Sequence, residues 1–192
     1  GWIEKKIFPF VDKYLKCQLL KNKNLYKTKI YGKKVFSDYY FKNNGIIDSK
    51  EILNVGVLGL GTVGGGVVSA LQSAPEFFNS RAGKHIEVVA ACVRDPKKIR
   101  PAVEINFPVT SNPLDVVEDP NIDLVLELIG GLEPARKLVL KALNNGKNVV
   151  TANKALLATH GEEIFRLAAK KNCFVGYEAA VAGGIPIIKV IR

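Results

Sequence analysis

Residues 52–66 read Ile-Leu-Asn-Val-Gly-Val-Leu-Gly-Leu-Gly-Thr-Val-Gly-Gly-Gly, which is an apolar strand, a glycine-rich turn and the start of an apolar helix. This order is typical of backbone that receives the pyrophosphate of a dinucleotide. Gly59 permits the tight turn, Gly61 leaves no side chain between backbone and phosphate, and Gly64 lets the helix pack closely on the sheet. The N–H groups and dipole of the helix then face the anion. The sequence therefore predicts a dinucleotide site, and the alternative is a purely structural strand-to-helix turn.

From residue 51 onward, apolar strand-like runs alternate with helical patterns. This alternation predicts an α/β fold with a doubly wound parallel sheet of the Rossmann type. We expect Pro75 to end the first helix and residues 76–84 to form a loop. The expected strands are 53–59, 85–93, 107–110, 123–129, 148–151 and 173–177, and the expected helices are 62–73, 112–119, 133–145 and 154–171.

The charge of the chain is concentrated in its first 50 residues. They hold twelve lysines and four acidic residues, and so eight of the ten net positive charges. The predicted organisation is a basic, poorly patterned extension over 1–50, an NAD(P)-binding domain over 51–176, and the start of a truncated second domain over 177–192. A nucleic-acid contact by the lysines and tyrosines of the extension is the alternative to a merely appended segment, and we consider it the less favoured of the two.

Cofactor choice is normally decided at the end of the second strand, where an acidic residue binds the 2′-hydroxyl of NAD and an arginine accepts the 2′-phosphate of NADP. This chain has Arg94 followed by Asp95 at that place. Arg94 therefore favours NADP, while Asp95 keeps NAD possible. The alternative is an Arg94–Asp95 ion pair in a surface loop.

The remaining composition indicates a cytoplasmic protein. Cys17, Cys92 and Cys173 form no Cys-x-x-Cys motif and are expected to be free thiols, mostly buried. His85 and His160 have no ligand-spaced partners, so we expect no transition-metal site. No apolar run approaches the roughly 20 residues of a membrane span. The lack of any methionine suggests a piece of a longer protein.

Five motifs in order resemble those of the homoserine dehydrogenase family. The resemblance covers 51–192 without a gap and excludes 1–50. The motifs are Gly59-Leu-Gly-Thr-Val-Gly64, Val93-Arg-Asp95, Glu127-Leu-Ile-Gly-Gly131, Val150-Thr-Ala-Asn-Lys-Ala-Leu-Leu157 and Tyr177-Glu-Ala-Ala-Val-Ala-Gly-Gly-Ile-Pro186. The resemblance implies a nucleotide-binding domain followed by the start of the substrate and dimerisation domain.

The resemblance also implies an activity, the reversible NAD(P)H-dependent reduction of L-aspartate 4-semialdehyde to L-homoserine in threonine and methionine biosynthesis. The general-acid lysine and the acidic substrate-binding residues of the family would lie beyond the position that matches Arg192, so no certain catalytic residue is expected here and this fragment is expected to be inactive alone. Lys154 is a possible accessory residue, whose cation could stabilise the developing alkoxide. The full-length form is expected to be a homo-oligomer with this small-molecule substrate.

The candidate site residues fall into two groups. A monovalent cation such as sodium is implied at main-chain oxygens near the C-terminus, and a glycine-rich hinge without an ion is the alternative. Glu127 lies in an apolar strand, where it either orients a neighbouring loop or reaches solvent. The cofactor candidates are Gly59, Gly61, Thr62, Val63, Gly64, Arg94, Ile129, Gly130 and Lys154, and the cation candidates are Glu178, Val181, Gly183 and Ile185.

Two other functions remain open. The chain could be a dinucleotide-binding module without catalysis, or part of another NAD(P)-dependent oxidoreductase with a similar first domain. Both share the predicted cofactor site, and they differ in what the rest of the protein does with the bound dinucleotide.

Overall fold

The computed structural model describes residues 29–31, 34–35, 52–100 and 103–181. The chain divides into two units, residues 49–183 and residues 1–48 with 184–192. In the second unit the described elements are β1 (Lys29–Tyr31) and β2 (Lys34–Val35), which pair antiparallel. The extension therefore contains a short strand pair that its composition did not predict.

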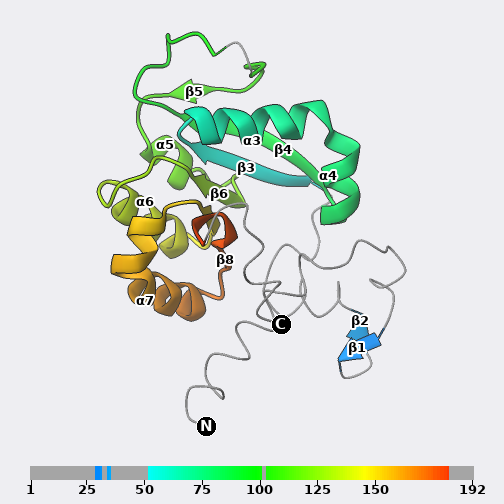
Figure 1. The fold of residues 1–192 in the computed structure, drawn as a ribbon, viewed down its shortest axis with the longest axis vertical. Helices are drawn as coiled ribbons and strands as arrows, with labels where there is room; N and C mark the ends of the chain where they lie inside the picture. Colours follow the sequence, from blue (N-terminus) through cyan, green and yellow to red (C-terminus); the bar gives the residue numbers. More distant parts are fainter. Residues whose placement is uncertain (1–28, 32–33, 36–51, 101–102, 182–192) are drawn as a thin grey trace. The chain divides into compact units, whose positions relative to one another are not determined.

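A parallel sheet of six strands organises the larger unit (Figure 1). Its spatial order is β5-β4-β3-β6-β7-β8, and every neighbouring pair is parallel. Strand order runs outward in both directions from β3, which is the doubly wound arrangement that was predicted. The strands are β3 (Ile52–Leu58), β4 (His85–Cys92), β5 (Val109–Thr110), β6 (Leu124–Glu127), β7 (Asn148–Thr151) and β8 (Val175–Gly176).

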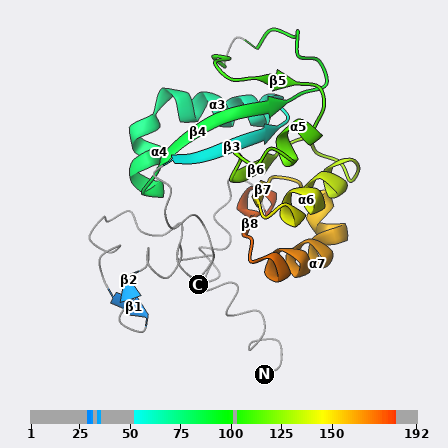
Figure 2. The same ribbon diagram turned by 180° about the vertical axis from the view of Figure 1, so that it is seen from behind.

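Helices connect these strands. The first helix and the fifth predicted strand have the predicted bounds, and the long helix ends at Lys171 as expected. Figures 1 and 2 show α3 and α4 beside the β3–β4 half of the sheet, and α6 and α7 beside the β6–β8 half. The helices are α3 (Thr62–Ser73), α4 (Pro75–Ala82), α5 (Leu114–Val117), α6 (Ala135–Asn144) and α7 (Lys154–Lys171), followed by the 3-10 turn η2 (Glu178–Ala180).

Two hydrophobic clusters cover the two faces of the sheet. Alternating residues of one strand belong to different clusters, since Val57 packs with one and Leu58 with the other. The first cluster joins the strands to α5, α6 and α7, and the second joins them to α3 and to the segment around Val103 and Phe107. Side chains of a strand point alternately to opposite faces, so both faces of this sheet are buried.

The predicted loop over 76–84 is wrong, because the segment forms helix α4. Pro75 occupies the first turn of α4, where a missing N–H costs nothing, and Gly83 ends the helix in the left-handed conformation at φ +69°. Pro75 therefore both ends one helix and starts the next.

Four predicted strands are shorter in the structure, and the one expected over 85–93 loses only Val93. The strand expected over 123–129 stops at Glu127 because the Glu127 side chain accepts the N–H groups of Ile129 and Gly130, which are then lost to the ladder. The strands expected over 107–110 and 173–177 pair only at Val109–Thr110 and Val175–Gly176.

The cysteines agree with the prediction of free thiols. Cys92 is buried, Cys173 is half-buried, and Cys17 lies outside the described residues. Burial raises the pKa of the Cys92 thiol, and the Asp115 carboxylate raises it further. In the described ranges, no helix combines the length and the apolar character needed to cross a bilayer.

Candidate functional site

The candidate site lies at the carboxyl ends of β3 and β6, where the strand order reverses. Leu58 of β3 and Glu127 of β6 are register partners, and the next residues lead into the two loops that flank this point. The Leu128 N–H donates to the Leu58 carbonyl at 2.9 Å, so both loops start from a fixed separation. In open α/β sheets, ligands bind in the crevice at this switch point.

Close backbone packing requires glycine at two positions of the turn. Gly59 has φ +101°, and an added Cβ would lie 2.9 Å from the Leu128 carbonyl oxygen. At Gly64 an added Cβ would lie only 1.8 Å from the Gly59 carbonyl oxygen. The first glycine therefore brings β3 against β6, and the second brings α3 against the turn.

Gly61 differs from these two glycines because an added Cβ would meet no atom within 4 Å. No contact inside the described protein explains why a side chain is missing there. Open space beside a glycine at a helix N-terminus fits a cradle for a phosphate that comes close to the backbone.

The N-terminus of α3 opens toward the same space. Its N-cap residue is Gly61, which provides no side-chain cap, and Thr62 and Val63 are exposed. In the described part of the chain, no hydrogen bond is made by the N–H groups of Thr62, Val63 or Gly64. These donors and the helix dipole suit an anion.

Arg94 follows β4 directly and is exposed. Its guanidinium makes no ion pair or hydrogen bond with any described residue, so the predicted alternative of an Arg94–Asp95 pair is wrong. The Asp95 side chain instead accepts the Lys97 N–H at 3.0 Å, and Arg100 donates to the Asp95 carbonyl at 3.0 Å. The loop is thus fixed by Asp95 and Arg100 while Arg94 stays available to a ligand.

Glu127 orients the loop after β6, which decides between the two alternatives stated for it. Its side chain is fully buried. Oε1 accepts the N–H groups of Ile129 at 3.0 Å and of Gly130 at 3.3 Å. Gly130 has φ +79°, a conformation that glycine adopts without strain. Ile129 and Gly130 therefore lie at the switch point in a loop fixed from behind.

Lys154 begins α7 beside this loop and is exposed. The preceding Asn153 caps the helix, since its Oδ1 accepts the Leu156 N–H at 3.1 Å. Its Nδ2 donates to the Gly131 carbonyl at 2.6 Å, and its own N–H donates to Thr151 Oγ1 at 3.0 Å. A hydrogen bond thus joins the two segments that carry the candidate residues after β6 and after β7.

Thr151 and Asn153 are site-building residues that the sequence analysis did not single out. A signal for Asn153 was present, because asparagine before a helical pattern is a standard N-cap. Thr151 had no comparable signal, because its role depends on being the register partner of Glu127.

The cation candidates are only partly described. Glu178 begins η2 and Val181 follows it, while Gly183 and Ile185 lie outside the described residues. The Glu178 carbonyl accepts the Val181 N–H at 3.0 Å and keeps one lone pair for another ligand. Burial raises the pKa of the Glu178 carboxyl.

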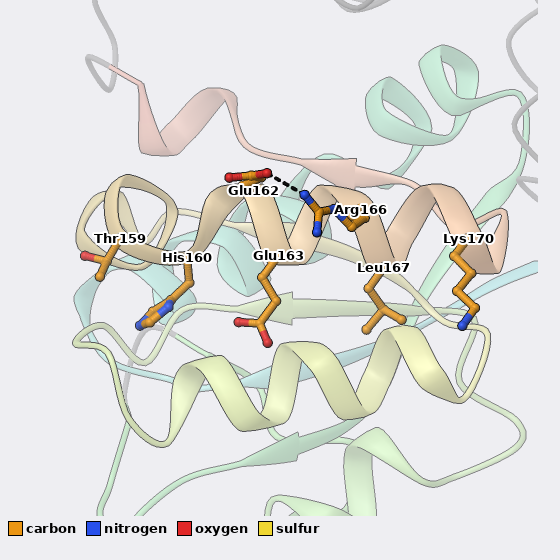
Figure 3. Close-up of a pocket in the computed structure, with 7 residues that line it drawn as sticks. All are labelled: Thr159, His160, Glu162, Glu163, Arg166, Leu167 and Lys170. Atoms are coloured by element: carbon orange, nitrogen blue, oxygen red, sulfur yellow. Dashed lines mark hydrogen bonds and ion pairs between the residues drawn. The ribbon is translucent and has the colours of Figure 1, made fainter.

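A shallow pocket lies elsewhere and is lined by residues of α7 between 159 and 170 (Figure 3). In Figure 3 the side chains of His160 and Glu163 point toward the neighbouring helix α6, and the Glu162–Arg166 pair lies on the other side. The pocket contains none of the predicted site residues. The switch point combines the open space beside Gly61 with the free N–H groups of α3, so it is the better candidate for a ligand site than this pocket.

Residues 59–178 match the family model described as "Homoserine dehydrogenase, NAD binding domain". A homoserine dehydrogenase of Pseudomonas aeruginosa is 52% identical over 141 residues, which are 73% of this chain and 32% of that protein.

Solved structures give the same result. A homoserine dehydrogenase from Thiobacillus denitrificans has a TM-score of 0.69 and 56% identity, covering 73% of this chain and 32% of the other. One from S. aureus has a TM-score of 0.64 and 36% identity, covering 68% and 34%. The chain therefore spans about a third of the length of the relatives it matches.

Proposed function

This chain belongs to the homoserine dehydrogenase family, and from that premise we propose that it is the dinucleotide-binding region of an enzyme that reduces L-aspartate 4-semialdehyde to L-homoserine. The observation that supports cofactor binding is the open space at Gly61 beside the free N–H groups of Thr62 and Val63. Family membership supports the substrate.

The residues of this chain divide the binding of the dinucleotide between them. Gly61, Thr62, Val63 and Gly64 present backbone donors to the pyrophosphate, and Gly59 sets the turn. Ile129 and Gly130 line the path across the switch point. When bound, the reduced dinucleotide supplies the hydride for the aldehyde carbon.

Lys154 is proposed to contact the dinucleotide and the reacting carbonyl. It is exposed at the first position of α7, where the helix dipole disfavours a cation unless an anion lies nearby. Its ammonium group would stabilise the negative charge that develops on the aldehyde oxygen. The oxygen must also gain a proton, and we expect the general acid to belong to residues outside this chain.

Arg94 is proposed to select NADP over NAD. It is exposed, unpaired within the described residues and next to the end of β4, where the 2′-position of the adenosine ribose is read. A guanidinium binds a phosphate in two parallel hydrogen bonds and so favours the 2′-phosphate.

Three further proposals complete this function. A monovalent cation such as sodium is held by the main-chain oxygens of Glu178, Val181, Gly183 and Ile185. The full-length protein is a homo-oligomer, and it works in the cytoplasm.

The experiment is a fluorescence titration of this chain with NADPH and with NADH. We expect NADPH to bind more tightly, and Arg94→Ala to remove the difference. Lys97→Ala is the matched control, since it removes the same charge from the same loop. An equal loss in both variants would contradict a specific role of Arg94, and no binding of either nucleotide would contradict the cofactor site itself.

A turnover assay with NADPH and aspartate semialdehyde tests the second half of the proposal. We expect these residues alone to bind NADPH without consuming it. Turnover by this chain would show that the acid lies within it, contrary to our expectation.

A further inference from the structure

The described structure contains a fully buried carboxylate, Glu127, at the end of the central strand β6. Its register partners are Leu58, just before the glycine turn, and Thr151, just before the loop to α7. Glu127 therefore lies between the glycine turn that follows β3 and the loop that joins β7 to α7. A carboxylate in this setting is costly unless its oxygens are occupied.

Both oxygens of Glu127 are occupied by donors. Oε1 accepts the N–H groups of Ile129 and Gly130, and Oε2 accepts the hydroxyl of Thr151 at 2.5 Å. In the described ranges, no Lys, Arg or His nitrogen pairs with this carboxylate. Glu127 is therefore held by hydrogen bonds from its own site, and it is not part of an ion pair.

These hydrogen bonds close a circuit between two loops. The hydroxyl of Thr151 donates to Glu127 and accepts the N–H of Asn153. Asn153 donates in turn to the carbonyl of Gly131, in the loop that Glu127 fixes. The position of the first turn of α7 is thereby tied to the backbone of residues 129–131.

The circuit lies on one side of the dinucleotide site. Arg94 marks the adenosine side, because β4 neighbours β3 on one flank. β6 and β7 lie on the other flank, so a dinucleotide that crosses the switch point must place its nicotinamide half over the loops that Glu127 joins.

We propose that Glu127 is a positioning residue for the nicotinamide half of the cofactor: through Thr151 and Asn153 it holds residues 129–131 and Lys154 in their binding geometry before the cofactor arrives. This inference rests on the function proposed above. Preorganisation of this kind raises affinity because the loops need not be ordered on binding.

The chemistry explains why a carboxylate is used. Two backbone N–H groups and one hydroxyl all act as donors, and the two oxygens of a carboxylate accept all three. In Glu127→Gln an amide group of the same size turns one acceptor into a donor. If Oε1 keeps the backbone N–H groups, Nε2 faces the oxygen of Thr151, and the hydroxyl can no longer donate to residue 127. The charge-assisted hydrogen bond from Thr151 is then lost while the volume is kept.

The experiment uses the 192-residue chain and two ligands, NADPH and the adenosine-half analogue 2′,5′-ADP. The variants are Glu127→Gln, Thr151→Val and Thr151→Ser, with Glu162→Gln as the charge-matched control on the exposed side of α7. Kd is measured for each ligand, and amide hydrogen exchange at Ile129, Gly130 and Asn153 is followed without ligand.

We expect Glu127→Gln and Thr151→Val to weaken NADPH binding about tenfold or more while 2′,5′-ADP binding stays within about twofold. Thr151→Ser should restore NADPH affinity, since it keeps the hydroxyl. In Thr151→Val, exchange should quicken at Ile129 and Gly130 as well as at Asn153, because the two loops are coupled. If Glu127→Gln does not fold, the two Thr151 variants decide the question.

The inference is overturned if the Thr151 variants bind NADPH as the unchanged protein does, or if both ligands weaken together with a lowered Tm. The second result would mean that the circuit supports only the fold. If the unchanged chain binds neither ligand, the proposed function fails and the inference falls with it, a result distinct from selective loss in the variants.

Discussion

The glycine turn at Gly59–Gly64 and the paired loops around Glu127 and Asn153 lie at the same edge of one sheet, yet they are built in opposite ways. The turn depends on missing side chains, since a Cβ at Gly64 would collide with the Gly59 carbonyl. The paired loops depend on buried polar side chains whose donors and acceptors satisfy one another.

The two regions differ in the kind of substitution that destabilises them. In the turn, an added side-chain atom destabilises the fold at Gly59 and Gly64, where another backbone segment is in contact. At Gly61, where no atom lies within 4 Å, it should have little effect on stability. In the paired loops, the removal of one partner leaves another buried polar group without its hydrogen bond. Substitutions at the two regions therefore test two separate physical rules.

The largest effect is expected at Gly64. Gly64→Ala places a methyl group 1.8 Å from the Gly59 oxygen, so the backbone must move. We expect a loss of roughly 3 kcal/mol in the free energy of unfolding, measured by urea denaturation. Gly66→Ala is the control in the same helix, because an added Cβ there meets nothing within 4 Å.

Gly66→Ala should be neutral or stabilising, by up to about 1 kcal/mol, because alanine has the higher helix propensity. Equal stability of the two variants would show that the close approach at Gly64 is relaxed in solution. The glycine turn would then not depend on missing side chains in the way proposed here.

A smaller loss of stability is expected at Asn153, which is 6% exposed. Asn153→Ala removes the cap on the Leu156 N–H and the donor to the Gly131 carbonyl. We expect a loss of about 2 kcal/mol in the free energy of unfolding, also measured in urea. Lys170→Ala, at an exposed position of the same helix, should change it by less than about 0.5 kcal/mol. A comparable loss in both would mean that the buried cap has no special weight.

Gly61 separates binding from folding within the glycine turn. Because an added Cβ meets no protein atom, Gly61→Ala should lower the free energy of unfolding by at most about 1 kcal/mol, the disadvantage of alanine at an N-cap. The methyl group would occupy the space proposed for the pyrophosphate, so we expect Kd for NADPH to rise about tenfold or more, measured by fluorescence. Undiminished binding would place the pyrophosphate elsewhere.

The two regions also differ in how far the sequence could predict them. The glycine turn is local, so the spacing of Gly59, Gly61 and Gly64 predicted both its position and the helix that follows. The partner of Glu127 is 24 residues away, and only the register of β6 and β7 brings Thr151 to it. The sequence thus identified Glu127 as unusual without deciding what it contacts.

Elsewhere the sequence failed where one residue fits two structures. Pro75 ends one helix and begins another, and α4 then packs against β4, a contact that spacing along the chain does not reveal. Arg94 and Asp95 could have paired with each other, but Asp95 instead accepts a backbone N–H within its own turn. Local competition for partners of this kind is not visible in spacing alone.

The smallest effect is expected from an exposed ion pair between α6 and α7. It shows how much a glutamate carboxylate stabilises the fold when, unlike that of Glu127, it is exposed to water. Arg136 binds Glu163 through two hydrogen bonds, at 2.8 and 2.7 Å, yet the Glu163 side chain remains 43% exposed. The hydrogen bond from Arg136 lowers the pKa of the Glu163 carboxyl, with a small further contribution from His160.

A lowered pKa in the folded state means that the pair stabilises the fold when Glu163 is ionised. The contribution is present above the ordinary pKa of glutamate and disappears as the pH falls through the lower, folded-state value. Glu163→Gln should therefore be slightly less stable than the unchanged chain near neutral pH and equal to it in acid, as measured by urea denaturation across this range. Because water and salt screen an exposed pair, the difference should be smaller than that for Asn153→Ala. A larger difference would show that exposed charge, and not burial, controls how strongly polar contacts stabilise this domain.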